Sequence, residues 1–182
     1  NWNTSNVTDM NFMFKGATSF NGDLSNWNTH NVTMMSNMFN SATSFNGDIS
    51  NWNTTAVTDM SLMFYEATSF NGDISSWNTA SLSRVMGMFQ YASIFDGNIS
   101  NWNTAAFENM GNMFRGASAF NGDISNWDTA AVTDMNQLFY DATSFNQDLK
   151  GWCVTNITAA SNFTTNSALT DANKPIWGTC PN

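Results

Sequence analysis

Eight tryptophans divide this chain into equal intervals, each lying 25 residues after the one before. They are Trp2, Trp27, Trp52, Trp77, Trp102, Trp127, Trp152 and Trp177, which are all the tryptophans of the 182-residue chain. A fixed period of this length without insertions is typical of stacked repeat coils. Because each coil of such a stack contacts only its neighbours, its stability is expected to be close to a sum of coil and interface contributions.

The first period, residues 1–25, predicts two elements in each coil. Apolar residues stand at repeat positions 7, 10, 13, 14 and 17, which are helical offsets and favour one short helix. Residues 22–27 instead alternate small polar residues with an apolar one at Leu24, and this pattern favours a short strand. We therefore expect an α/β solenoid, a right-handed, leucine-rich-repeat-like stack with one parallel strand and one helix per repeat.

The columns of identical residues predict the core and the division of the chain. Methionine, phenylalanine and tryptophan recur at fixed positions, as expected where identical coils stack at one spacing. Variation gathers at positions such as 15, which holds Lys15, Tyr65 and Arg115, and these residues are expected to face water. Residues 1–150 are read as six repeats, and residues 151–182 as a C-terminal capping coil.

The two cysteines, Cys153 and Cys180, both lie in the expected capping coil, about one period apart. That spacing places them on neighbouring coils, so we expect a disulfide and with it an oxidising compartment. The chain opens inside a repeat, with apolar residues and no polar cap. This opening predicts that the sequence is part of a longer polypeptide with a further coil or cap ahead of it.

Composition argues against several classes of function. The net charge is −9 with only five Lys and Arg residues, so nucleic acid is not an expected partner. No apolar run approaches 18 residues, which argues against membrane insertion. His30 is the only histidine, and no nucleophile–base set can be assembled around it, so we expect no enzyme, no zinc and no organic cofactor.

An acidic column carries the strongest hint of a ligand. The outward positions of the predicted strand hold Asp23, Ser25, Asp48, Ser50, Asp73, Ser75, Ser100, Asp123 and Ser125, which are the candidate binding residues. Like charges about 4.8 Å apart on neighbouring strands repel, so such a column requires a reason. One reason is a cation, and Asp23, Asp48 and Asp73 are candidate calcium ligands. The other is that each Asp accepts backbone N–H bonds within its own turn.

The repeat also resembles a known family. The residues that carry the resemblance are Val7-Thr8-Asp9-Met10, Met13-Phe14, Ala17-Thr18-Ser19-Phe20-Asn21 and Asp23-Leu24-Ser25-Asn26-Trp27. This repeat is similar to that of the BspA-like leucine-rich repeat family of bacterial surface proteins. The matching repeat of that family is about 25 residues long and is classed as a domain of unknown function. The resemblance implies a secreted or surface-anchored protein, with adhesion as one of the roles of its members, and it implies no particular ligand.

Three functions follow as expectations. The first is an extracellular, cell-surface adhesion module that binds a glycan or a protein partner through the Asp–Ser surface. The second is a structural stalk or spacer with no ligand. The third is ice binding, because threonines recur in two regular columns, one with Thr4, Thr29 and Thr54 and one with Thr18, Thr43, Thr68 and Thr143. The two columns are not adjacent in the coil, so turn-bonding hydroxyls are the better interpretation of both.

Overall fold

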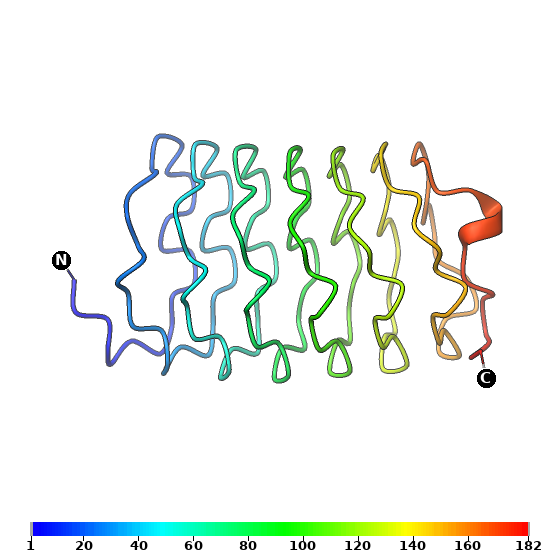
Figure 1. The fold of residues 1–182 in the computed structure, drawn as a ribbon, viewed down its shortest axis with the longest axis horizontal. Helices are drawn as coiled ribbons and strands as arrows, with labels where there is room; N and C mark the ends of the chain where they lie inside the picture. The colour runs from blue at the N-terminus through cyan, green and yellow to red at the C-terminus, as the bar shows by residue number, and fades with distance from the viewer. Residues whose placement is uncertain (1, 182) are drawn as a thin grey trace.

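Residues 2–181 are described by the computed structural model, in which the chain winds into coils of similar size stacked along one axis (Figure 1). The first coil lies at one end of the row and the C-terminal segment at the other. Backbone hydrogen bonds join neighbouring coils, as between Met60 N and Arg84 O at 2.9 Å. No helix within the described residues is long and apolar enough to cross a membrane.

The expected α/β solenoid, with a strand and a helix in each repeat, is wrong. Across residues 2–181 the one helical element is η1, a 3-10 helix over Asp171–Asn173 in the C-terminal segment. The same residues contain no strand, and coil-to-coil pairing is limited to isolated parallel bridges. Each coil is therefore built from turns and extended connections.

The segment expected to be helical, residues 9–17 and their counterparts in later repeats, is the turn side of each coil. Its bonds are turn bonds, from Lys15 N to Phe12 O at 3.1 Å and from Ala17 N to Phe14 O at 3.0 Å. Repeat positions 12 and 16 have positive φ in every coil. These residues are Phe12, Gly16, Asn37, Ser41, Leu62, Glu66, Gly87, Tyr91, Asn112, Gly116, Gln137, Asp141, Asn162 and Asn166. A right-handed helix needs negative φ throughout, so these two positions exclude it.

The strand expected over residues 22–27 is absent, and the backbone pairing between coils lies on the turn side instead. Residues 22–27 contribute no bridge, whereas the isolated parallel bridges join Asp9 to Met34 and the counterparts that follow, as far as Asp134. Residues 21–29 and their counterparts form the Asn–Trp side, where side chains link the coils. Thr29 Oγ1 donates to Asn53 O at 3.0 Å, and Trp52 Nε1 donates to Leu24 O at 3.2 Å. The alternation of residue types at 22–27 therefore reflects one inward side chain between two turns.

The core between the two sides is a set of aromatic columns, as the sequence predicts. Phe64 stacks on Phe70 of its own coil with ring centroids 3.8 Å apart, and on Phe39 and Phe89 of the adjacent coils at 5.7 Å. All four side chains are fully buried. Burial of such rings supplies most of the favourable free energy of folding, because apolar area removed from water contributes about 25 cal/mol per Å².

The C-terminal segment covers part of the last coil and ends the aromatic columns. Cys153 and Cys180 are joined by the expected disulfide. Val154 N donates to Thr179 O at 2.8 Å, and Trp177 packs edge-on against Phe163 with centroids 4.9 Å apart. In the last coil Thr164 and Thr170 replace the two core phenylalanines, so this contact adds apolar packing where the columns end.

Candidate functional site

The Asp–Ser row lies along the Asn–Trp side, with one Asp–Ser pair in each of four coils; the other two hold Asn98–Ser100 and Asp148–Lys150 at the same positions. Asp23 is exposed, and the intervening Leu24 is buried in the core. Asp23 Oδ1 accepts two bonds from Ser25, one from its backbone N at 2.9 Å and one from its hydroxyl at 2.6 Å. The buried apolar residue between them fixes each pair at the surface, because its side chain anchors the turn in the core.

The same geometry recurs along the stack. Asp48 and Ser50 form the two bonds at 3.0 and 2.7 Å, and Asp73 and Ser75 form them at 2.9 and 2.7 Å. Asp123 and Ser125 repeat them at 3.0 and 2.7 Å. Within residues 2–181, the second carboxylate oxygen of these aspartates accepts no hydrogen bond. Each of these aspartates thus makes the hydrogen bonds within its own turn that were one of the two explanations for the acidic column. One oxygen of each carboxylate remains open to solvent.

Hydrogen bonding keeps this row of carboxylates ionised. The Ser50 hydroxyl, followed by the Ser50 backbone N–H, holds the pKa of Asp48 below its ordinary value. The neighbouring charges of Asp23 and Asp73 act in the opposite direction and more weakly. The same two bonds lower the pKa of Asp23, Asp73 and Asp123. These bonds stabilise the charged form of each carboxylate within its own coil, against the repulsion along the column.

Asn98 occupies the column where its neighbours carry aspartate. Its amide oxygen accepts from Ser100 N at 3.1 Å and from the Ser100 hydroxyl at 2.8 Å. The turn therefore needs an oxygen acceptor, and it does not need a negative charge. The candidate cation ligands Asp23, Asp48 and Asp73 lie one to a coil, and across the described residues no three His, Cys, Asp or Glu side chains converge on one point.

The threonine columns differ from each other in exposure. Thr29, Thr54 and Thr79 are 1 % exposed, and their hydroxyls donate to carbonyls of the next coil, as Thr79 does to Asn103 O at 3.0 Å. In the column of Thr18, Thr43, Thr68 and Thr143, Thr43 is half-buried and the other three are exposed. Thr68 Oγ1 donates to Thr43 O at 3.4 Å. Turn and coil bonding explains both columns, and the buried one offers no surface to ice.

A cluster on the turn side was not anticipated from the sequence. It contains the three tyrosines of the chain: Tyr91 and Tyr140 lie against Arg115, and Tyr65 packs edge-on against Tyr91 with ring centroids 5.8 Å apart. The guanidinium carbon lies 5.6 Å from the Tyr91 ring centroid and 4.9 Å from that of Tyr140. Arg115 Nη1 donates to Gln137 Oε1 at 2.6 Å.

The signal available in the sequence was that the three tyrosines and Arg115 all stand at repeat positions 15 and 16. Stacking of a guanidinium between aromatic rings is worth about 0.5–1 kcal/mol at exposed sites. The cluster is also the most distinctive departure from repeat symmetry along the stack, which makes it a second candidate surface for a partner.

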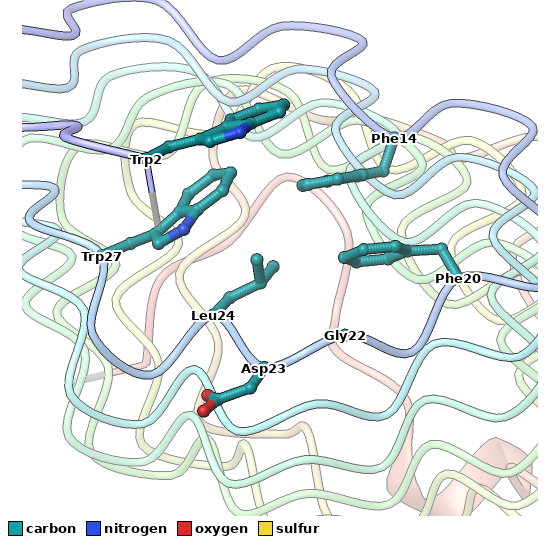
Figure 2. Close-up of a pocket in the computed structure, with 7 residues that line it drawn as sticks. All are labelled: Trp2, Phe14, Phe20, Gly22, Asp23, Leu24 and Trp27. Atoms are coloured by element: carbon teal, nitrogen blue, oxygen red, sulfur yellow. The ribbon is translucent and has the colours of Figure 1, made fainter.

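A hollow of about 230 Å³ opens at the free face of the first coil (Figure 2). It is lined by Trp2, Phe14, Phe20, Gly22, Asp23, Leu24 and Trp27. Figure 2 shows the two indole rings on one side of the hollow and the two phenyl rings on the other, with Leu24 between them. In later coils the equivalent aromatic side chains are buried by the coil before them.

Comparison with known proteins gives a family and no activity. The protein-family model described as "Mycoplasma protein of unknown function, DUF285" matches the chain twice, over residues 1–95 and 71–177. The chain belongs to this family, and the two overlapping matches agree with its repeats. No curated protein and no solved structure matches the chain. The family has no assigned function, so any function must be argued from the surface itself.

Proposed function

We propose that this chain is an extracellular, cell-surface binding module that adheres to a glycan or a protein partner through its Asp–Ser row. The observation that carries the proposal is the regular row of exposed, ionised carboxylates, each with one oxygen unoccupied. Carboxylate oxygens accept hydrogen bonds from sugar hydroxyls and from Lys or Arg side chains. A ligand that repeats along its length would meet the same acceptor in each coil.

Charge and covalent structure support this proposal. The net charge of −9 attracts basic partners and speeds their association at low salt. The Cys153–Cys180 disulfide fits an oxidising, extracellular compartment. The resemblance of the repeat to BspA-like leucine-rich repeat surface proteins favours adhesion over an intracellular role.

Asn98 shows how the charges of the row can be removed without disturbing the turns. Because Asn98 keeps both bonds to Ser100, the double variant Asp48→Asn/Asp73→Asn should preserve the fold and remove two charges from the centre of the row. The wild-type chain is screened on a glycan array and against basic peptides, and hits are measured by titration calorimetry. We expect the double variant to weaken binding about tenfold or more, which corresponds to about 1.4 kcal/mol.

The matched variants separate a specific row from general acidity. Asn98→Asp completes the row and should strengthen binding, whereas Asp141→Asn removes an equal charge from the turn side and should leave it unchanged. If no glycan or basic peptide binds, or if Asp141→Asn weakens binding as much as the double variant, the row is not the binding surface.

Two other roles are tested with the same protein. A structural stalk or spacer would bind nothing on the array, and all the variants would behave alike. Calcium binding by Asp23, Asp48 and Asp73 would make the melting temperature fall on addition of EDTA and recover with Ca²⁺, since a ligand that binds only the folded state stabilises it.

A further inference from the structure

The tyrosine cluster around Arg115 spans four successive coils in the interior of the stack. Tyr65 packs edge-on against Tyr91 with ring centroids 5.8 Å apart. The Arg115 guanidinium carbon lies against the rings of Tyr91 and Tyr140, at 5.6 and 4.9 Å from their centroids. Further coils lie before residue 51 and after residue 150, so the cluster does not depend on either end of the chain (Figure 1). It forms one continuous surface on the turn side.

Arg115 is a half-buried cation without an anionic partner. Three of the five Lys and Arg residues, Arg84, Lys150 and Lys174, pair with carboxylates, whereas no carboxylate within residues 2–181 forms an ion pair with Arg115. The chain holds 14 Asp and Glu residues, so anions are not scarce in it. A partly buried charge is normally paired, because water solvates it incompletely. An anion supplied by a ligand would complete this pairing.

The free hydrogen-bond donors of Arg115 share one edge of its guanidinium. Nη1 donates to Gln137 Oε1 at 2.6 Å, whereas Nε is fully buried and donates to nothing within residues 2–181. Nη2, which projects from the same edge as Nε, also has no acceptor among those residues and is not fully buried. The N–H groups of this edge match the two oxygens of one carboxylate. The bond to Gln137 thus orients the guanidinium through one nitrogen and leaves its carboxylate-binding edge free.

The tyrosine rings beside Arg115 add an apolar surface with polar tips. Tyr65, Tyr91 and Tyr140 are each half-buried, so part of every one of these side chains reaches solvent. The hydroxyls of Tyr91 and Tyr140 form no hydrogen bond within residues 2–181, and each can both donate and accept. Aromatic faces pack against the C–H groups of a sugar ring, and phenol hydroxyls bond to sugar hydroxyls. Rings combined with a few polar groups are typical of small-ligand sites.

The charge and the main chain of the turn side narrow the class of ligand. Arg115 is the only cation of the cluster, and the net charge of −9 repels a long polyanion. An extended peptide would need free main-chain groups, but those of these coils already join one another, as Phe89 N does to Met113 O at 2.9 Å. One carboxylate on an otherwise neutral sugar chain meets both conditions.

We propose that the tyrosine cluster around Arg115 binds a single acidic sugar, a uronic or sialic acid, within an otherwise neutral glycan. The carboxylate pairs with the free edge of Arg115, and the sugar packs on the rings of Tyr91 and Tyr140. This site is separate from the Asp–Ser row, whose carboxylates would repel such a ligand, and it does not rest on the function proposed for that row.

Acidic sugars and their neutral counterparts test the site. Methyl glucuronide is compared with methyl glucoside, and sialyllactose with lactose, by NMR titration of the wild-type chain. The titrations are made at about 150 mM salt, where the negative field of the chain is screened. We expect at least one acidic sugar to bind with a dissociation constant of about 1 mM, a value usual for a single weak contact. Its neutral counterpart should bind about tenfold more weakly, because it lacks the charge-assisted hydrogen bonds to Arg115.

Variants at one repeat position provide matched controls. Arg115→Gln should weaken binding of the acidic sugar about tenfold, to the level of the neutral one. Glutamine already stands at the equivalent position as Gln90, so the turn should be preserved. Lys15→Gln removes an equal charge at the same repeat position outside the cluster and should leave binding unchanged. Arg115→Lys keeps the charge but loses the paired N–H groups, so its affinity should fall between those of the wild type and Arg115→Gln.

Two double variants separate the rings and the Asp–Ser row from the charge. Tyr91→Leu/Tyr140→Leu should weaken binding of the acidic sugar although Arg115 remains, and Asp48→Asn/Asp73→Asn should leave it unchanged. Circular dichroism checks that each variant is folded, and Arg115→Lys replaces Arg115→Gln if the glutamine variant is not. The proposal would be overturned if no acidic sugar binds, if acidic and neutral sugars bind equally, or if the Arg115 variants bind as the wild type does. Binding of peptides with a free C-terminal carboxylate, without binding of any acidic sugar, would also overturn it.

Discussion

The turn side and the Asn–Trp side of each coil are both hydrogen-bonded to the neighbouring coils, but through different atoms. On the turn side the main chain joins the coils, as from Phe64 N to Met88 O at 2.9 Å. On the Asn–Trp side the links are side chains, as from Asp96 N to Asn71 Oδ1 at 2.9 Å. A main-chain link is indifferent to residue type, whereas a side-chain link is not.

This difference explains the pattern of variation along the repeats. Turn-side position 15 holds Lys, Asn, Tyr, Gln, Arg and Tyr in succession, because only its backbone joins the coils. The buried position that begins with Thr4 is threonine in all of the first six repeats. Threonine recurs there because its hydroxyl is itself the link, as in the bond from Thr54 Oγ1 to Asn78 O at 2.9 Å.

The largest effect is expected where the two sides meet. Phe64 lies on the turn side, Phe70 directly precedes the Asn–Trp side, and their stacked rings connect the two sides in the core. Phe64→Ala and Phe70→Ala should each lower the free energy of unfolding by about 3–5 kcal/mol, from lost burial and the cavity left behind. The double variant should cost less than the sum, because the two cavities merge.

Chemical denaturation measures these free energies. Ile94→Ala, which truncates an apolar side chain that is 48 % exposed, serves as the control and should change stability by about 0.5 kcal/mol or less. If the losses in unfolding free energy of the two phenylalanine variants simply add in the double variant, the two sides are stabilised independently. That result would contradict a core shared by both sides.

The next effect tests the side-chain links. Thr79→Val keeps the shape of a side chain that is 1 % exposed but removes the donor to Asn103 O. Loss of this part-buried hydrogen bond costs about 0.5–1.5 kcal/mol, and denaturation should show a loss in that range. Thr58→Val removes an exposed bond to Thr33 O at 3.3 Å and should cost about 0.5 kcal/mol or less. Equal losses in the two variants would contradict the assignment of the linking role to the buried column.

The sequence predicts the period, the core columns and the disulfide, and it does not predict the turns. A helix and a series of turns both place every third or fourth side chain inwards, so the spacing of apolar residues cannot separate them. The distinguishing signal was at positions 12 and 16. Asn37, Asn112 and Asn162 with Gly87 mark the first, and Gly16 and Gly116 mark the second, as residue types that tolerate positive φ. Leu62 and Tyr91 stand at the same positions, and because such residue types rarely adopt positive φ they made the pattern hard to recognise.

The candidate site was predictable in part for a related reason. The Asp–Ser column follows from the repeat alone, because Asp and Ser recur there with one residue between them. The tyrosine cluster around Arg115 does not, since Tyr91 and Arg115 belong to different positions of neighbouring coils. Their contact depends on the lateral offset between coils, and one repeat read by itself does not contain that offset.

A comparable effect tests the backbone constraint on the turn side. Glu66 has φ of 54°, and its carboxylate accepts from the Ser41 hydroxyl at 3.0 Å. Glu66→Val and Glu66→Gly both lose this bond, so their difference reports the backbone alone. The valine variant should be less stable than the glycine variant by about 1–2 kcal/mol, because a β-branched residue is strained at positive φ. Equal thermal unfolding of the two would show that this position does not need a left-handed conformation.

The smallest expected effect is a loss of thermal stability at low pH, caused by protonation of aspartates on the Asn–Trp side. The pKa of Asp48 and Asp73 is held below the ordinary value of 3.8 by bonds from Ser50 and Ser75. A carboxylate with a lowered pKa in the folded state contributes stability above its unfolded pKa and loses it as pH falls through the folded pKa. The melting temperature of the wild type should therefore fall more steeply below about pH 4 than that of Asp48→Asn/Asp73→Asn. Ser50→Ala/Ser75→Ala keeps both charges but removes the hydroxyl donors, so its acid decline should also be shallower than that of the wild type. Parallel curves for all three proteins would mean that the Asp–Ser bonds, although regular, do not couple protonation of the row to folding.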